Sequence, residues 1–178
     1  MSSFFFRALP GLTILWIGDL QGQTQLLVDP GFEKQTWDLK DKSMASYSPE
    51  AAKNGAMGLR LQDDSPEGKA MALSELGPIQ GGKECQLRGF VRVKNRVYIE
   101  LEFFDADKKK ISGKLGEGFP HEVKGALLDQ VDTLGEWQEF TVNCLAPPEG
   151  AFIRVFLHTY SKGTGWSADF DDLALTQP

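Results

Sequence analysis

Glu100 and Glu102 stand two positions apart in VYIELEF, a segment in which the apolar residues recur at every second position. This alternation predicts a β-strand, and alternate residues of a strand point to the same face at a spacing of about 6.5 to 7 Å. Two carboxyl groups at that spacing lie between the separations required by the retaining and inverting mechanisms of glycosidic-bond hydrolysis. Asp105 has the opposite parity and is better placed to open the turn DADKK.

His158 and Tyr160 form a second pair at strand spacing, in FIRVFLHTY. A tyrosine and a histidine transfer protons in polysaccharide lyases, but those enzymes also need a strand with several arginines beside glutamine and histidine, which this sequence lacks. It also lacks a nucleophile elbow, a phosphate-binding glycine loop and an HExxH motif. We therefore expect no enzymatic activity, and a glycosidase that uses Glu100 and Glu102 is the less favoured alternative.

Three aspartates crowd into ADFDDLAL near the end of the chain: Asp169, Asp171 and Asp172. Strand alternation puts Asp171 on the same side as Leu173 and Leu175, which predicts that it faces the core. A buried carboxylate must be neutralised, and no lysine or arginine is near in sequence, so a distant cation or a metal ion is expected. Asp169 and Asp172 are expected on the solvent side.

Segments with this two-residue period recur along the chain between Gly, Pro, Asn and Asp, which predicts an all-β fold. The eight expected strands are 26–33, 57–63, 69–76, 84–93, 96–105, 137–146, 152–160 and 167–176. Residues 48–55 are expected to form a single helical turn, and residues 116–135 a long loop that contains His121. Strands in this order favour a two-sheet antiparallel β-sandwich of the jelly-roll, galactose-binding-domain-like type.

The outward positions of two of these strands carry an unusual mixture of aromatic and charged residues. If the strands are neighbours, one surface collects Tyr98, Glu100, Glu102, Phe104, Arg154, Phe156, His158 and Tyr160. Aromatic rings stack on the C–H faces of sugars, and charged groups bind sugar hydroxyls. Trp37 and Trp166 lie in expected loops and are candidate platforms at the rim, whereas Trp137 opens a strand and is expected to pack.

Cys85 and Cys144 each share the parity of the inward apolar residues of their strands. If the start of one strand lies antiparallel to the end of the other, the two cysteines could form a disulfide. Two buried free thiols are an equally good interpretation.

The chain has 178 residues, which suits one domain. Residues 1–22 place Arg7 before a short apolar stretch, which predicts a signal peptide and export of bacterial type to the periplasm or the exterior. A retained anchor is the alternative, and the single domain would span residues 23–178. The net charge of −6 argues against nucleic acid or anionic membranes as partners. The oligomeric state is left open.

The order of motifs along the chain resembles that of the jelly-roll carbohydrate-binding modules of families 4, 9 and 22. The motifs are DPGFE followed by W, then AAKNGAMGLRL, CQLRGFVRV, IELEFFDADKKK, EWQEFTV, PPEGAFIRVFL and ADFDDLAL, within residues 26–176. The resemblance implies a non-catalytic sandwich that binds polysaccharide, with a buried structural calcium ion. No catalytic domain accompanies this chain, which puts the usual targeting role in doubt.

By this resemblance, the carboxylates of Glu33 and Asp171 would bind the calcium ion, together with backbone carbonyls near Gly31 and from Lys53 or Asn54. Such an oxygen-rich set meets the demand of Ca²⁺. The expected function is therefore binding of a polysaccharide or oligosaccharide on the concave face of the sandwich. The alternative is a structural or protein-interaction sandwich that has no sugar site.

Overall fold

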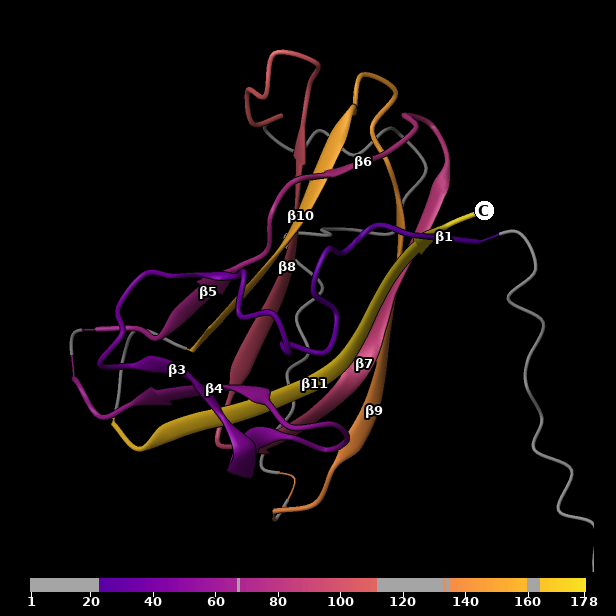
Figure 1. Ribbon diagram of the computed structural model, residues 1–178. Coiled ribbons are helices and arrows are strands. Elements are labelled where there is room, and N and C mark those ends of the chain that lie inside the picture. Colours follow the sequence, from indigo (N-terminus) through magenta and orange to yellow (C-terminus); the bar gives the residue numbers. More distant parts are fainter. Residues whose placement is uncertain (1–22, 67, 112–132, 134, 160–163) are drawn as a thin grey trace, which may run out of the picture.

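The computed structural model describes residues 23–66, 68–111, 133, 135–159 and 164–178. Within these residues the chain forms two antiparallel β-sheets and one turn of 3-10 helix, η1 (Pro49–Ala51), without any α-helix. The sheets pack as the two layers of a sandwich, seen in Figure 1. The predicted all-β sandwich is confirmed, and η1 lies in the predicted helical turn.

The first sheet has the order β3–β4–β11–β7–β9, and β1 pairs with the end of β11. Its strands are β1 (Thr24–Gln25), β3 (Ala45–Ser48), β4 (Gly58–Asp63), β7 (Glu84–Lys94), β9 (Gln138–Leu145) and β11 (Trp166–Gln177). The last strand of the chain therefore lies at the centre of this sheet.

The second sheet is built around β10, which pairs with β8 along one edge and with β5 and β6 along the other. A short strand, β2, extends the sheet beyond β5. Its strands are β2 (Asp38–Leu39), β5 (Met71–Leu73), β6 (Gly77–Pro78), β8 (Val97–Phe104) and β10 (Phe152–Thr159).

Alternate residues of both sheets meet in the core between the layers. Leu87 and Val91 of β7 have no exposed surface, and neither do Ile99 of β8 and Leu157 of β10. A fully buried aliphatic side chain of this size stabilises a fold by about 1.5 to 3 kcal/mol relative to an exposed one. The inward residues of these three strands are those that the alternation predicted.

The strand expected at residues 26–33 is wrong. After β1 the chain turns, because the carboxylate of Asp29 accepts hydrogen bonds from the backbone N–H groups of Lys34 and Thr36. Pro30 has no N–H to offer to a ladder, and Val28 is 49% exposed. The apolar residues at this point predicted a strand, but local hydrogen bonds to Asp29 give a compact turn.

A β-bulge in β11 changes which side chains face the core. Asp171 pairs with Phe90 of β7, and β11 then has two residues, Asp172 and Leu173, where β7 has only Gly89. Asp172 has φ 51°, in the left-handed region, which aspartate adopts more readily than most residues. The extra residue reverses the parity, so Leu173 is buried over Gly89 while Asp171 points away from the core. The predicted inward direction of Asp171 is therefore wrong.

The predicted signal peptide at residues 1–22 and most of the predicted loop at 116–135, with His121, lie outside the described residues and stay predictions. In the part of the chain that is described, no helix has the length and apolar character needed to cross a membrane.

Candidate functional site

The two strands that carry the aromatic and charged mixture are neighbours, and their register joins the outward residues in pairs. The pairs are Tyr98 with His158, Glu100 with Phe156, Glu102 with Arg154 and Phe104 with Phe152. These eight side chains, all on the side away from the core, define the outer face of the β8–β10 sheet. Aromatic rings and hydrogen-bonding groups thus alternate along one continuous band.

Glu102 is the centre of an ion-pair cluster on this face. Its carboxylate lies 2.5 Å from the Nζ of Lys110 and 2.5 Å from the Nε of Arg154. Burial raises the pKa of Glu102, but the hydrogen bonds from Lys110 and Arg154 outweigh it, so the pKa lies below the usual glutamate value. Glu102 is therefore held in its ionised form, whereas a general acid needs a raised pKa.

The imidazole ring of His158 lies between two hydrogen-bond partners. Its Nδ1 lies 2.9 Å from the carbonyl oxygen of Thr159, and its Nε2 lies 3.0 Å from Oε1 of Glu100. The two contacts fix the orientation of the ring, and the contact with Glu100 makes the imidazole and the carboxylate one hydrogen-bonded unit.

Aromatic rings flank the His158 ring on this face. The Tyr98 ring is stacked at 5.0 Å between centroids with planes 12° apart, and the Phe156 ring lies at 4.6 Å with a 31° tilt. Tyr98 and Phe156 are half-buried, so each ring still has surface open to solvent.

Cations lie over the three phenylalanine rings of the outer face. The distances from cation to ring centroid are 5.0 Å for Arg154 over Phe104, 5.5 Å for Lys69 over Phe156 and 5.6 Å for Lys108 over Phe152. Each distance is within the range of a cation–π interaction. Lys69 precedes β5, and Lys108 belongs to the turn after β8, where the carboxylate of Asp105 accepts from two backbone N–H groups.

Trp37 is not a platform at the rim. Its side chain is 4% exposed and packs on Phe32 with 5.1 Å between ring centroids, and its Nε1 donates to the carbonyl of Asp29 at 3.0 Å. The turn around Asp29 folds this segment onto the core, which the loop-like sequence did not reveal.

Trp166 is the first residue of β11, is half-buried, and pairs with Asp63 of β4 in the other sheet. The prediction that it lies in a loop is wrong, and its role as a platform at the rim stays a prediction. Tyr160 lies outside the described residues and stays a prediction.

Asp171 has backbone N–H groups as partners. Its side chain is 1% exposed, and it accepts hydrogen bonds from the N–H groups of Lys53 at 2.7 Å, Asn54 at 2.9 Å and Asp172 at 2.8 Å. Among the described residues, no lysine, arginine or histidine forms an ion pair with it. Burial raises the pKa of Asp171 above its usual value, and the nearby charge of Asp172 acts in the same direction.

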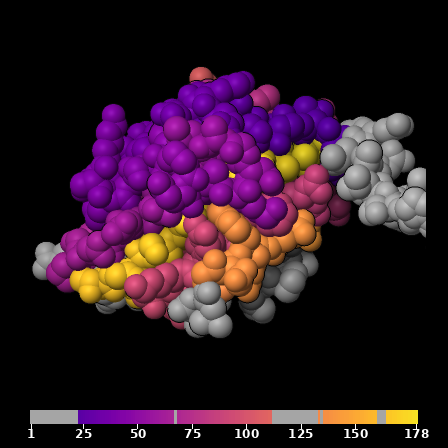
Figure 2. Space-filling view, turned by 60° about the horizontal axis from the view of Figure 1, so that its bottom comes forward, coloured from indigo at the N-terminus to yellow at the C-terminus, as the bar shows by residue number. Residues whose placement is uncertain are grey.

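Glu33 reaches the same turn from the other side. Its Oε1 accepts from the N–H groups of Ala56 at 2.7 Å and Met57 at 3.2 Å. Gly55 has φ 69°, and a Cβ there would lie 2.1 Å from this oxygen, so glycine leaves room for the Glu33 carboxylate. In Figure 2 the C-terminal residues, in yellow, show at the surface between the indigo and purple N-terminal half and the magenta and orange strands.

Glu33 and Asp171, two residues of the expected calcium site, both bind N–H groups of the 53–57 turn, and a Cβ on Gly31 would lie 4.0 Å from Oδ1 of Asp171. Lys53 and Asn54 present N–H groups to Asp171, where carbonyls were expected. Within the described residues, no three His, Cys, Asp or Glu side chains gather as a metal-binding group. The donor chemistry that fits calcium is that of the two carboxylates, with backbone carbonyls to complete the shell.

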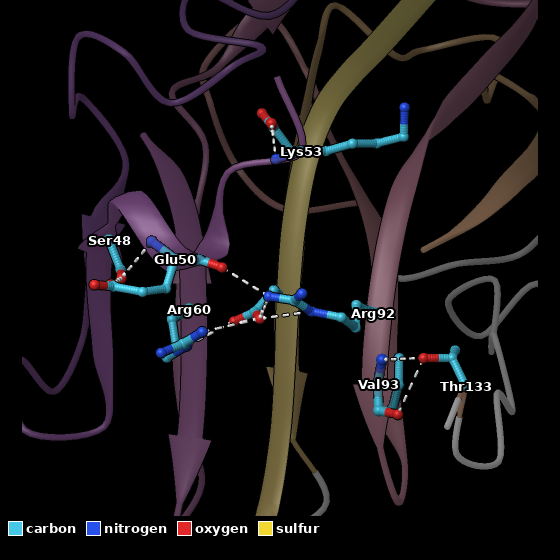
Figure 3. Close-up of polar contacts among 9 residues, drawn as sticks. Ser48, Glu50, Lys53, Arg60, Arg92, Val93 and Thr133 are labelled. Atoms are coloured by element: carbon cyan, nitrogen blue, oxygen red, sulfur yellow. Dashed lines mark hydrogen bonds and ion pairs between the residues drawn. The ribbon is translucent and has the colours of Figure 1, made fainter. Parts of the chain in front are cut away.

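Asp169 is buried between two arginines, which corrects the expectation that it faces solvent. Figure 3 shows Arg60 of β4 and Arg92 of β7 on either side of β11, where their guanidinium groups meet the carboxylate of Asp169 at 2.7 and 2.6 Å. Arg92 also donates to the carbonyl of Glu50 at 2.7 Å, which links η1 to the sheet. The hydrogen bonds that Arg60 donates to Asp169 raise the pKa of Arg60. Neighbouring strands supply these cations, so the sequence near Asp169 gave no sign of them.

Cys85 and Cys144 lie directly opposite each other on β7 and β9 and form a disulfide, with 5.1 Å between their Cα atoms. A cavity of about 580 Å³ opens beside the disulfide, with Gln86, Asn143 and Thr176 in its wall. It belongs to the first sheet, and no aromatic ring lines it. The outer face of the β8–β10 sheet, by contrast, carries aromatic rings along its whole length.

Lys69, Lys108 and Phe152 were not among the residues expected at the site. The even parity of Phe152 relative to Arg154 and Phe156 could have identified it. The two lysines had no such signal, because their position depends on the pairing of β5 with β10 and on the turn conformation after β8.

Neither a protein-family model nor a curated protein matches the sequence. Solved structures do share the fold. A family 61 carbohydrate-binding module in complex with β-1,4-galactotriose aligns with a TM-score of 0.56 and 16% identity, over 87% of this chain and 99% of the module. A family 16 carbohydrate-binding module aligns with a TM-score of 0.58 and 15% identity, over 84% of this chain and 98% of the module.

The CBM22-1–GH10 modules of Clostridium thermocellum endo-1,4-β-D-xylanase 10B, complexed with xylohexaose, give a TM-score of 0.54 and 16% identity. This similarity covers 87% of the present chain and 28% of that one. The chain therefore has the fold of the jelly-roll carbohydrate-binding modules, as its motifs implied.

Proposed function

We propose that this protein binds glycan chains, without cleaving them, on the outer face of the β8–β10 sheet. The observation that supports the proposal is the register of β8 with β10, which sets Tyr98 beside His158 and Phe156 beside Glu100. Modules of the same fold bind β-1,4-galactotriose and xylohexaose, and an extended chain of sugars suits a continuous band better than a closed pocket.

The half-buried rings of Tyr98 and Phe156 would provide the apolar surface on which a sugar ring stacks. The carboxylate of Glu100 is 36% exposed and would accept hydrogen bonds from sugar hydroxyls, while Arg154, 29% exposed, would donate them. Base–aromatic stacking in nucleic-acid complexes contributes about 1 to 3 kcal/mol per ring, and a stacked sugar is expected at the lower end of that range.

The same contacts support a binding role and disfavour catalysis. Glu102 is ionised between Lys110 and Arg154, and Glu100 is tied to His158. Hydrolysis needs one carboxyl group with a raised pKa to protonate the leaving oxygen, together with a second that is free to act as base or nucleophile. Neither glutamate is arranged for these roles.

We also propose a structural calcium ion at Glu33 and Asp171. The supporting observation is that the buried carboxylate of Asp171 has a raised pKa and no ion-pair partner among the described residues. When bound, the ion would neutralise this carboxylate and fasten the 53–57 turn to β11. The ion would stabilise the fold and would take no part in binding the sugar.

Export to an oxidising compartment is a further part of the proposal. The disulfide between Cys85 and Cys144 supports it, because structural disulfides persist in the periplasm and outside the cell and are rare in reducing cytoplasm. The predicted signal peptide at residues 1–22 is consistent with this location.

Isothermal titration calorimetry against soluble glucans, xylans, mannans, galactans and uronic polymers tests the proposed function. We expect saturable binding to at least one polymer, with no release of reducing sugar. Absence of binding across the whole panel would overturn the proposal and leave a structural or protein-interaction sandwich. Reducing-sugar release that Glu100→Gln abolishes would restore the glycosidase alternative.

A further inference from the structure

The rings of the outer face are capped by cations. Lys69, Lys108 and Arg154 lie over Phe156, Phe152 and Phe104. A cation over a ring is attracted to its negative face. This surface therefore offers a ligand aromatic rings with ammonium and guanidinium groups beside them.

The carboxylates of the face do not cancel this positive charge. The single negative charge of Glu102 is shared by Lys110 and Arg154, so this cluster keeps one net positive charge. Lys110 is 58% exposed, and Lys108 is exposed as well. Oε1 of Glu100 is engaged by Nε2 of His158 at 3.0 Å.

Lys69 and Lys108 form no ion pair with a described carboxylate, so their charges are available to a ligand. These cations belong to a chain whose net charge is −6, and the turn that carries Lys108 and Lys110 also holds Asp105 and Asp107. The positive charge of this face is therefore local to its individual ammonium and guanidinium groups.

We propose that the outer face of the β8–β10 sheet selects acidic glycans, namely polymers that carry uronic acid carboxylates. This inference rests on the proposed function and adds the chemical class of the ligand. A carboxylate every few sugars would meet Lys108 and Lys110 at one end of the band and Lys69 toward the other. Such solvent-exposed charge contacts are individually weak and are screened by salt.

Two or three contacts of this kind predict a preference for the acidic polymer of about 3- to 30-fold at low salt. The test compares polygalacturonate with neutral β-1,4-galactan by calorimetry, at low salt and at high salt. We expect the preference at low salt and its loss at high salt. Poly-glutamate serves as a polyanion without sugars.

The variants Lys69→Gln and Lys108→Asn, made singly and together, test whether these two lysines bind the acidic polymer. Asparagine is chosen at position 108 because it tolerates the φ of 59° there. We expect the ratio of acidic to neutral affinity to fall toward one in the double variant. The matched control is Lys94→Gln, an exposed lysine at the end of β7 in the other sheet, which should keep the ratio of the wild type.

The outcomes separate this inference from the proposed function. Neutral and acidic polymers that bind equally well would overturn the acidic preference and leave glycan binding intact. Absence of binding to every sugar polymer would overturn both the acidic preference and the proposed glycan binding. Poly-glutamate that binds as tightly as polygalacturonate would overturn the inference too, because the face would then recognise charge without sugar.

Discussion

Arg154 of β10 lies directly opposite Glu102 of β8, and its Nε donates to Oε2 of Glu102 at 2.5 Å. This cross-strand ion pair joins the two strands of the candidate site at the centre of their register. Lys110 binds the other oxygen of the same carboxylate, so the turn after β8 is attached to the sheet through Glu102.

Glu102→Gln should lower the free energy of unfolding by about 1 to 2 kcal/mol at pH 7, because a charge-assisted hydrogen bond is lost at a buried acceptor. The folded-state pKa of Glu102 lies below its unfolded value of about 4.3. Its stabilising contribution is therefore complete above that value and disappears as the pH falls through the folded pKa. Urea unfolding at pH 7 and near pH 3 measures the difference.

The difference between Glu102→Gln and wild type should vanish in acid. Glu84→Gln, at the exposed start of β7, is the control and should be neutral at both pH values. An equal loss at both pH values would show that packing, and not the ionised carboxylate, explains the effect.

Tyr98→Ala and Phe156→Ala should each weaken glycan binding by about 5- to 30-fold, since each removes one half-buried ring from the band. Trp137→Ala is the matched control: that ring is also half-buried and lies under a guanidinium, 5.0 Å from Arg92, but it belongs to the other sheet. Calorimetry with the best polymer of the panel gives the affinities. If Trp137→Ala weakens binding as much as the other two variants, the proposal that glycans bind to the β8–β10 sheet is contradicted.

The alternation of residues along β8 and β10 was sufficient to predict their outward side chains, because both strands are regular and pair along eight residues. It failed at Asp171 because the bulge at Asp172 inserts one residue, and no glycine marks that position in the sequence. The prediction for Trp37 failed for another reason: its segment was expected to be an exposed loop, but hydrogen bonds to Asp29 fold it onto the core.

Long-range pairing explains what else the sequence could not predict. The cations that hold Asp169 come from β4 and β7, each far along the chain from it. Lys69 reaches Phe156 only because β5 pairs with β10. Neither relationship follows from local periodicity, which reports the two faces of a strand and not its neighbours.

Calcium should raise the melting temperature of the wild-type protein, and EGTA should reverse the change, since a ligand that binds only the folded state stabilises it. Asp171→Asn should abolish the response because it removes the buried carboxylate. Asp64→Asn, an exposed aspartate after β4, should keep it. A melting temperature that is indifferent to calcium and to EGTA in the wild type would contradict the proposed ion.

Acidification should affect Asp171 in the opposite sense from Glu102. The pKa of Asp171 is raised in the folded state, mainly by burial. Its contribution to stability is therefore complete below the unfolded value of about 3.9 and is lost as the pH rises through the folded pKa. In the presence of EGTA, the difference in unfolding free energy between wild type and Asp171→Asn should grow as the pH falls through this interval. A difference that stays constant with pH would contradict the raised pKa.

Removal of the disulfide should lower the free energy of unfolding by about 2 to 4 kcal/mol, because the bond closes a long loop in the unfolded chain. The two cysteines are 59 positions apart and join β7 to the edge strand β9. The variant with both Cys85→Ala and Cys144→Ala should unfold at lower urea, and dithiothreitol should shift the wild type in the same direction. Dithiothreitol should not shift the double variant, which separates loss of the bond from any general effect of the reductant. A wild type that unfolds at the same urea concentration with and without dithiothreitol, under conditions where thiol titration shows the bond reduced, would contradict a stabilising role for this disulfide.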